Sequence, residues 1–169
     1  LLKRYDEAIA IYLDIEKQAP NRYSTASNLG TIYELTGKNA EALKWIKKSV
    51  VIDPTSHENS EWMHVKILEA KIGGEKFITS SFLLNTNFGT DSLPVSSMKI
   101  DILRNLEKSL SYQLNERITF IKPKDKIIAQ LFFKLGNISF ITGQRYDSEW
   151  NYKKAKEYID QFFPRLSKT

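Results

Sequence analysis

Two histidines and a carboxylate are the residues of this chain whose types and spacing could do chemistry. His57, Glu61 and His64 are spaced i, i+4 and i+7, so a helix that begins early enough would place all three on one face. Two imidazoles and a carboxylate are suitable ligands for zinc or iron. No second acidic cluster completes such a site, and His57 falls at or before the expected start of the helix. We therefore interpret the histidines as a buried or capping pair and expect no metal.

Other catalytic constellations have no counterpart in the sequence. The chain has no cysteine, which excludes disulfides, thiolate metal sites and cysteine nucleophiles. Its serines stand in no G-x-S-x-G elbow. Gly73-Gly74 lacks the G-K-[ST] ending of a phosphate-binding loop. We expect no catalytic residue and no cofactor, and we predict that the protein is not an enzyme.

Length and charge narrow the class of protein further. A chain of 169 residues suits one domain over 1–169 that can bury a sizeable core. No apolar run reaches the roughly 18 residues of a membrane span, so we expect no direct membrane insertion. Residues 1–100 carry 12 basic and 12 acidic groups, whereas 101–169 carry 13 and 8, which accounts for the whole net charge of +5. Because no aromatic and basic residues interleave as in RNA-binding motifs, we interpret these lysines as a solvated face and expect no nucleic-acid partner.

A repeat of 34 residues organises the first part of the chain. Four positions recur at that distance: Ala8 and Ala42, Tyr12 and Ile46, Ile15 and Ser49, Pro20 and Pro54. Small residues at Gly30 and Ala42 allow two antiparallel helices to approach closely, and Gly37 suits the left-handed residue that ends a helix. The spacing therefore predicts helix pairs that stack on one another.

This pattern resembles the tetratricopeptide repeat (TPR) family, whose signature is W-x2-L-G-x2-Y, then A-x3-F, then P. The matching residues are Leu29, Gly30, Tyr33, Ala42, Ile46 and Pro54, while Ala26 stands where tryptophan is usual. The resemblance implies an all-α, TPR-like right-handed α-solenoid of antiparallel helix pairs. We expect about seven helices and one irregular insertion.

Hydrophobic periodicity predicts seven helices, over 6–18, 24–36, 40–52, 58–72, 101–121, 124–142 and 145–162. They divide into a truncated repeat at 1–20, a full TPR at 23–56, a repeat at 57–123 split by an insertion at 73–99, and a degenerate C-terminal repeat at 124–163. In this last repeat Leu135-Gly136 restore the L-G pair, and Ser148, Tyr152 and Ala155 supply a small-aromatic-small pattern. Because the chain begins at Leu1 and its start matches the second helix of a repeat, we expect a fragment or a processed product.

The insertion is the unusual element. Residues 75–98 have no helical period, but they carry few charges and include six large apolar residues between Phe77 and Phe88, a composition that is not typical of disorder. A loop of this length inside a compact domain is uncommon. One interpretation is that its apolar side chains cover an edge of the solenoid. The other is that they lie in the concave groove and shape or block a ligand site.

The TPR resemblance also implies a function, which is the binding of a peptide or protein segment in a groove lined by the first helices of successive repeats. The positions that would face it are Ser27, Asn28, Thr31 and Glu34, then Glu61, Trp62, Val65 and Lys66, then Phe133, Lys134 and Asn137. Trp62 and Phe133 are the first candidates for anchors, although core packing would also explain them. The alternative is a structural segment of a larger protein whose groove is filled by its own insertion at 75–98, with no separate ligand.

The order of segments is also similar to that of uncharacterised bacterial TPR-containing proteins. That resemblance brings no activity with it, and it favours an exported or periplasmic protein, with a cytoplasmic one as the alternative. The truncated first repeat could expose an apolar face that pairs with a second copy, since solenoids that lack a terminal cap carry this risk. The partner itself is not identified by the sequence.

Overall fold

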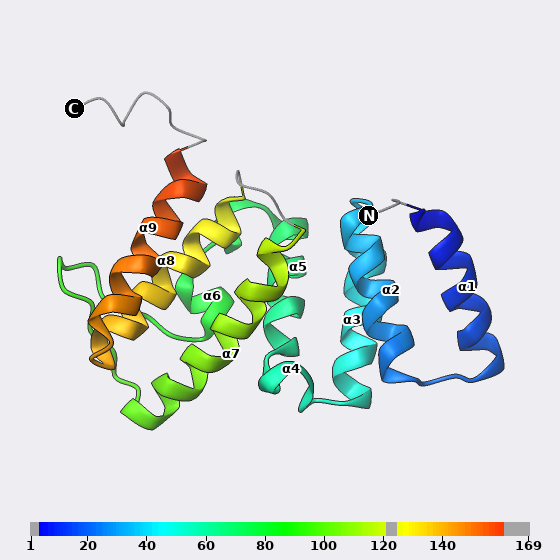
Figure 1. Cartoon of the computed structure of the whole chain (residues 1–169), viewed down its shortest axis with the longest axis horizontal. Coiled ribbons are helices and arrows are strands. Elements are labelled where there is room, and N and C mark those ends of the chain that lie inside the picture. The colour runs from blue at the N-terminus through cyan, green and yellow to red at the C-terminus, as the bar shows by residue number, and fades with distance from the viewer. Residues whose placement is uncertain (1–3, 121–124, 161–169) are drawn as a thin grey trace. The chain divides into compact units, whose positions relative to one another are not determined.

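The computed structural model describes residues 4–120 and 125–160, and every regular element in those ranges is a helix (Figure 1). The chain divides into two compact units, Leu1–Gly74 and Glu75–Thr169. Within each unit the helices pack in neighbouring pairs. The prediction of an all-α, TPR-like helical repeat is confirmed, and its right-handed sense stays a prediction.

The described residues of unit 1 form four helices, α1 (Tyr5–Gln18), α2 (Tyr23–Leu35), α3 (Asn39–Ile52) and α5 (Glu61–Gly73), and a short turn between the last two, α4 (Ser56–Asn59), in which His57 and Glu58 are not right-handed helical. Helix α1 packs on α2, α2 on α3, and α3 on α5. Their alternating directions are visible in Figure 1. All seven predicted helices are present, with bounds within three residues of those predicted.

A close approach of α2 and α3 forms the centre of unit 1. A Cβ atom added at Gly30 would collide with the Ile46 side chain, so the absence of a side chain there allows the two helices to meet. Ile46, Ala42 and Leu68 form a fully buried cluster that brings α5 into the same core. The small residues of the repeat therefore have the packing role that the sequence predicts.

The first helix of each well-defined pair ends in the same way. Gly37 follows α2 with φ +78°, and Gly143 follows α8 (Lys126–Ile141) with φ +87°. The residue after each glycine donates its amide back to the helix. Lys38 donates to the Tyr33 carbonyl at 2.9 Å, and Gln144 donates to the Ser139 carbonyl at 2.8 Å. These bonds satisfy carbonyls that the helix leaves free, and glycine adopts the left-handed conformation of this turn without the strain of a side chain.

Unit 2 is built around α8. The other helices are a 3₁₀ turn at Glu75–Phe77, α6 (Ser80–Leu84), α7 (Ile100–Ile118) and α9 (Arg145–Asp160). Helix α8 packs against α6, α7 and α9. A Cβ at Gly136 would lie 2.6 Å from the Tyr152 ring, so Gly136 and Tyr152 repeat the relationship of Gly30 and Ile46. The C-terminal helix pair is thus assembled like the second repeat.

The insertion is more regular than its sequence indicates. We expected no helix over 75–98, but α6 forms there, because the Thr79 side chain caps it by accepting from the Phe82 amide at 3.2 Å. Leu83, Leu84 and Phe88 are each only 1% exposed. These three apolar residues of the insertion are therefore part of the core of unit 2.

Parts of the predicted domain plan lie across or outside these units. The predicted third repeat, 57–123, spans the boundary between unit 1 and unit 2, and its pairing stays a prediction. Residues 121–124, where the predicted helix over 101–121 ends and the next begins, lie outside the described residues, as do 1–3 at the start of the truncated repeat. The assignment of 1–169 to a single solenoid domain remains an expectation.

Candidate functional site

The segment that carries the two histidines enters α5 through an unusual backbone. His57, Glu58 and Asn59 all have positive φ, between 52° and 57°, so they form a left-handed turn and not the first turn of the predicted helix. Each such residue costs about 1–2 kcal/mol relative to the right-handed form when it is not glycine. The Ser60 amide donates to the His57 carbonyl at 3.0 Å and closes the turn. The early helix start that would place His57, Glu61 and His64 on one face is therefore not met, because α5 begins only at Glu61.

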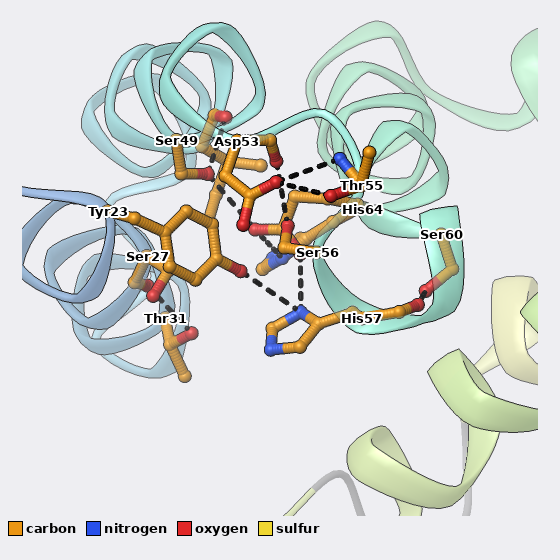
Figure 2. A network of polar contacts seen from close by, with 12 residues as sticks. Tyr23, Ser27, Thr31, Ser49, Asp53, Thr55, Ser56, His57, Ser60 and His64 are labelled. Carbon is orange, nitrogen blue, oxygen red and sulfur yellow. Dashed lines mark hydrogen bonds and ion pairs between the residues drawn. The ribbon is translucent and has the colours of Figure 1, made fainter.

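The left-handed turn nevertheless brings His57 to Glu61. The Nδ1 atom of His57 lies 2.7 Å from Oε2 of Glu61 and 3.4 Å from the Tyr23 hydroxyl. Oε1 of Glu61 accepts from the Ser49 hydroxyl at 3.1 Å. Figure 2 shows Tyr23, Ser49 and His57 converging from three different segments of unit 1.

Glu61 is a buried carboxylate that its neighbours keep ionised. It is 1% exposed. Burial acts to raise its pKa, but the hydrogen bond with His57 and the charges of His64 and His57 outweigh burial, so the pKa of Glu61 lies below its usual range. Glu61 is thus a core residue of the helix pair and can contribute to a groove only through the residues that it holds.

His64 belongs to a second buried contact. Its Nε2 atom lies 2.6 Å from Oε2 of Glu34, and the Lys71 ammonium donates to Oε1 of Glu34 at 2.7 Å. Both Glu34 and His64 are less than 9% exposed. Glu34 was expected to face the groove; this prediction is wrong, because Glu34 pairs with α5 inside the unit.

These contacts form a polar network whose side chains are hydrogen-bond and ion-pair partners of one another. Within residues 4–120 and 125–160 no three His, Cys, Asp or Glu side chains are grouped as metal ligands would be. His64 is buried, as the sequence predicts. The hydrogen bonds of this network therefore connect α2, α3 and α5 inside unit 1.

The remaining predicted groove residues of unit 1 lie on α2 and α5. Asn28 is exposed, and Thr31 donates its hydroxyl to the Ser27 carbonyl at 3.0 Å. Trp62 is partly exposed. Lys66 forms an ion pair with Glu69 at 3.8 Å. Asn28 and Trp62 thus offer an exposed amide and a partly exposed aromatic ring to a partner.

In unit 2 the structure brings all three predicted residues together. Phe133, Lys134 and Asn137 of α8 line a cavity of about 680 Å³, which we call the α8 cavity. Residues 88–94 of the insertion form another wall, and Tyr152 and Ala155 of α9 form a third. Asn137 is buried, and its Oδ1 accepts from the Tyr152 hydroxyl at 2.8 Å.

Lys134 is the distinctive charge of the α8 cavity. Its ammonium lies 4.9 Å from the centre of the Phe133 ring and 5.9 Å from that of Phe88. Burial lowers the pKa of Lys134, as expected for an ammonium among apolar groups. Among the described residues no carboxylate forms an ion pair with it.

Sequence reasoning missed two parts of this site. Phe140 lies seven residues after Phe133 and lines the same cavity, so helical periodicity could have identified it. The wall from 88–94 could not have been placed by periodicity, because that segment is irregular.

A second, smaller cavity of about 280 Å³ adjoins polar groups that already have partners. Ser139 donates to Glu107 at 2.6 Å, Thr142 donates to the other oxygen of Glu107 at 3.2 Å, and Asn151 donates to Ser139 at 3.3 Å. These bonds link α7, α8 and α9. Glu107 is buried because both of its carboxylate oxygens accept hydrogen bonds there, which is a structural role.

Comparison with known proteins supports the repeat assignment. Residues 23–56 match the family model of the tetratricopeptide repeat, the same range that the sequence predicts as a full repeat. That family is in general a non-catalytic scaffold for protein–protein interaction. No curated protein matches the chain. None of the described helices is both long and apolar enough to cross a membrane.

Proposed function

We propose that the chain is a non-catalytic interaction module that binds a peptide or protein segment in a concave groove of its helical repeats. The observation that carries this proposal is the tetratricopeptide repeat at 23–56. The proposed contact residues are Asn28, Thr31, Glu61, Trp62, Lys66, Phe133, Lys134 and Asn137, with Glu61 acting through the residues that it positions. Phe133, at 42% exposed, and the partly exposed Trp62 are the aromatic anchors.

One observation favours a second candidate function. Phe88 of the insertion is buried beside Lys134, as expected if the insertion occupies the groove of a structural segment within a larger protein. The α8 cavity left beside Phe88 supports the first proposal, because the insertion lines this space without filling it.

Selection from a random peptide library on the purified whole chain tests the proposal. We expect an enriched sequence whose binding weakens at least about tenfold in Trp62→Ala, since aromatic anchors carry much of an interface's free energy. Lys44→Ala is the control, because Lys44 is exposed on the second helix of its pair. Circular dichroism checks that both variants fold.

Two results would contradict the interaction module. One is a library with no enriched sequence. The other is binding that no variant at Asn28, Trp62 or Phe133 alters. Hydrogen exchange then separates the second candidate, which requires strong protection of 75–98 in the chain alone and no further change with any peptide.

A further inference from the structure

The α8 cavity has walls of unequal chemistry. Phe133 and Phe140, 42% and 40% exposed, and Leu93, 61% exposed, supply its apolar surface. Its volume lies in the range of about 300–1,000 Å³ that is usual for binding sites. Exposed aromatic rings around a hollow of this size favour an occupant that covers them.

The charged groups that line the α8 cavity are Lys134, Lys156 and Asp91. Lys134 is partly buried near two aromatic rings and lacks an ion pair with Asp91 or any other described carboxylate. An ammonium held among apolar groups has lost water without gaining a counter-charge. A carboxylate from outside would restore the missing partner.

We propose that the α8 cavity binds a polypeptide segment in which an acidic side chain stands next to an aromatic or large aliphatic one. The carboxylate pairs with the Lys134 ammonium, and the apolar side chain packs against Phe133, Phe140 and Leu93. This inference rests on the proposed function and names the chemistry of its partner in unit 2. The insertion, through 88–94, thereby becomes a wall of the binding site.

A polypeptide fits the cavity better than a free small anion does. One wall, 88–94, is an irregular backbone segment beside α8. Its peptide groups, together with the exposed rings, can meet an extended chain over several residues. A free anion would engage Lys134 and leave part of the exposed apolar surface uncovered.

Short capped peptides test the inference on the whole chain. The probes are acetyl-Gly-Asp-Phe-Gly-amide, the same peptide with Asn for Asp, and the same peptide with Gly for Phe. Their blocked ends leave the side chain as the one source of a carboxylate. Amide NMR shifts of 88–94 and 133–137 report binding, and we expect a dissociation constant of about 1 mM or lower for the first peptide.

A double-mutant cycle assigns the carboxylate to its partner. We expect the Asn peptide to bind about tenfold more weakly, and Lys134→Met to weaken the Asp peptide by about the same factor while leaving the Asn peptide unchanged. Lys153→Met is the control, because Lys153 is exposed on α9 and does not line the cavity. The Gly peptide should also bind weakly, since it lacks the apolar side chain.

Each contrary result has a defined meaning. Equal binding of the Asp and Asn peptides at these amides would overturn the acidic preference and leave the interaction module intact. A library selection whose peptides change the amide NMR shifts of α2 and α5 alone would likewise overturn the inference about the α8 cavity and leave the interaction module intact. If 3-phenylpropanoate binds as tightly as the Asp peptide, the occupant is a small anion and the inference is wrong. If neither the probes nor the library bind, both proposals fail.

Discussion

His64 and Glu34 form a direct buried contact, with Nε2 of His64 2.6 Å from Oε2 of Glu34. These residues come from α5 and α2, which do not follow one another in the chain. Lys71 binds the other oxygen of Glu34 at 2.7 Å. One carboxylate therefore ties two positions of α5 to the first helix of the repeat.

Loss of either member of this contact should destabilise unit 1. We expect His64→Ala and Glu34→Ala each to lower the free energy of unfolding by about 2–4 kcal/mol, because removal of one partner takes from the other, which is buried, the polar group that it contacts directly. The double variant should show a coupling of about 1–3 kcal/mol. Native-state hydrogen exchange of α2 and α5 amides measures it within unit 1.

The Lys47–Glu69 ion pair provides a matched control for this cycle. It joins α3 to α5 at 2.9 Å but is far more exposed, so its coupling should be about 0.2–1 kcal/mol. A coupling for His64 and Glu34 no larger than this would show that the contact does not hold the helices together.

The lowered pKa of Glu61 gives unit 1 a defined dependence on pH. Its folded pKa lies below the ordinary value of 4.5, so the ionised carboxylate stabilises the fold. This contribution is fully present above about pH 4.5 and is lost as the pH falls through the folded pKa. Glu61→Gln should therefore cost about 1–3 kcal/mol at neutral pH, and the difference from the unchanged chain should narrow in acid.

Measurement in a His57→Ala background checks the cause of the Glu61 effect. His57, His64 and the Ser49 hydroxyl surround the carboxylate, and Glu34 with Lys71 belongs to the same network. Without His57 the acid-dependent part of the difference should become smaller. A Glu61→Gln difference that is constant between pH 7 and pH 3 would contradict this account.

Because 57–59 form a left-handed turn, glycine should stabilise the protein relative to alanine at position 58, the reverse of its effect within a helix. Glu58 has φ 56°, so Glu58→Gly relieves strain that Glu58→Ala keeps. We expect the glycine variant to be more stable than the alanine variant by about 1 kcal/mol. Thermal unfolding of both variants measures the difference, and comparison with alanine removes any effect of the lost carboxylate.

The sign of this difference identifies the backbone. If 57–59 formed the first turn of a right-handed helix, glycine would instead be less stable than alanine by about 1 kcal/mol. Lys44 in α3 supplies that reference, because Lys44→Gly should fall below Lys44→Ala by this amount. The same sign at both positions would refute the left-handed turn.

The seven long helices could be predicted because each carries its own periodic apolar face and its own end signal. Gly37 and Gly143 are such signals, and Gly30 and Gly136 mark the close approaches. His57 and Asn59 are residue types that tolerate the left-handed region, but without a glycine they do not by themselves predict three left-handed residues in a row. Their conformation depends on contacts of His57 with Tyr23 and Glu61 that only the folded unit supplies.

The candidate site was predicted in part for the same reason. Phe133, Lys134 and Asn137 are neighbours on one helix, so their common location followed from repeat positions. Glu34 was misplaced because its partners, His64 and Lys71, lie 30 and 37 residues away. Pairing over such distances depends on which helices meet, and a single sequence does not reveal this.

Gly30 and Gly37 should respond to alanine for different reasons. At Gly30 a new Cβ would collide with the Ile46 side chain and lie 3.3 Å from its backbone nitrogen, so Gly30→Ala should cost about 1–3 kcal/mol by forcing α2 and α3 apart. At Gly37 the Cβ would meet nothing, but φ is +78°, so Gly37→Ala should cost about 1–2 kcal/mol through the backbone alone.

A second substitution separates these two causes. Ile46→Val removes Cδ1, the nearer of the two Ile46 side-chain atoms that a Cβ at Gly30 would strike, so Gly30→Ala should cost less in that background, whereas Gly37→Ala should cost the same. Gly37→Asn should be milder than Gly37→Ala, because asparagine tolerates the left-handed region. Urea unfolding followed by circular dichroism measures all these variants. If the costs of Gly30→Ala and Ile46→Val simply added, the two residues would not be in contact, and the packing of α2 on α3 would have to be revised.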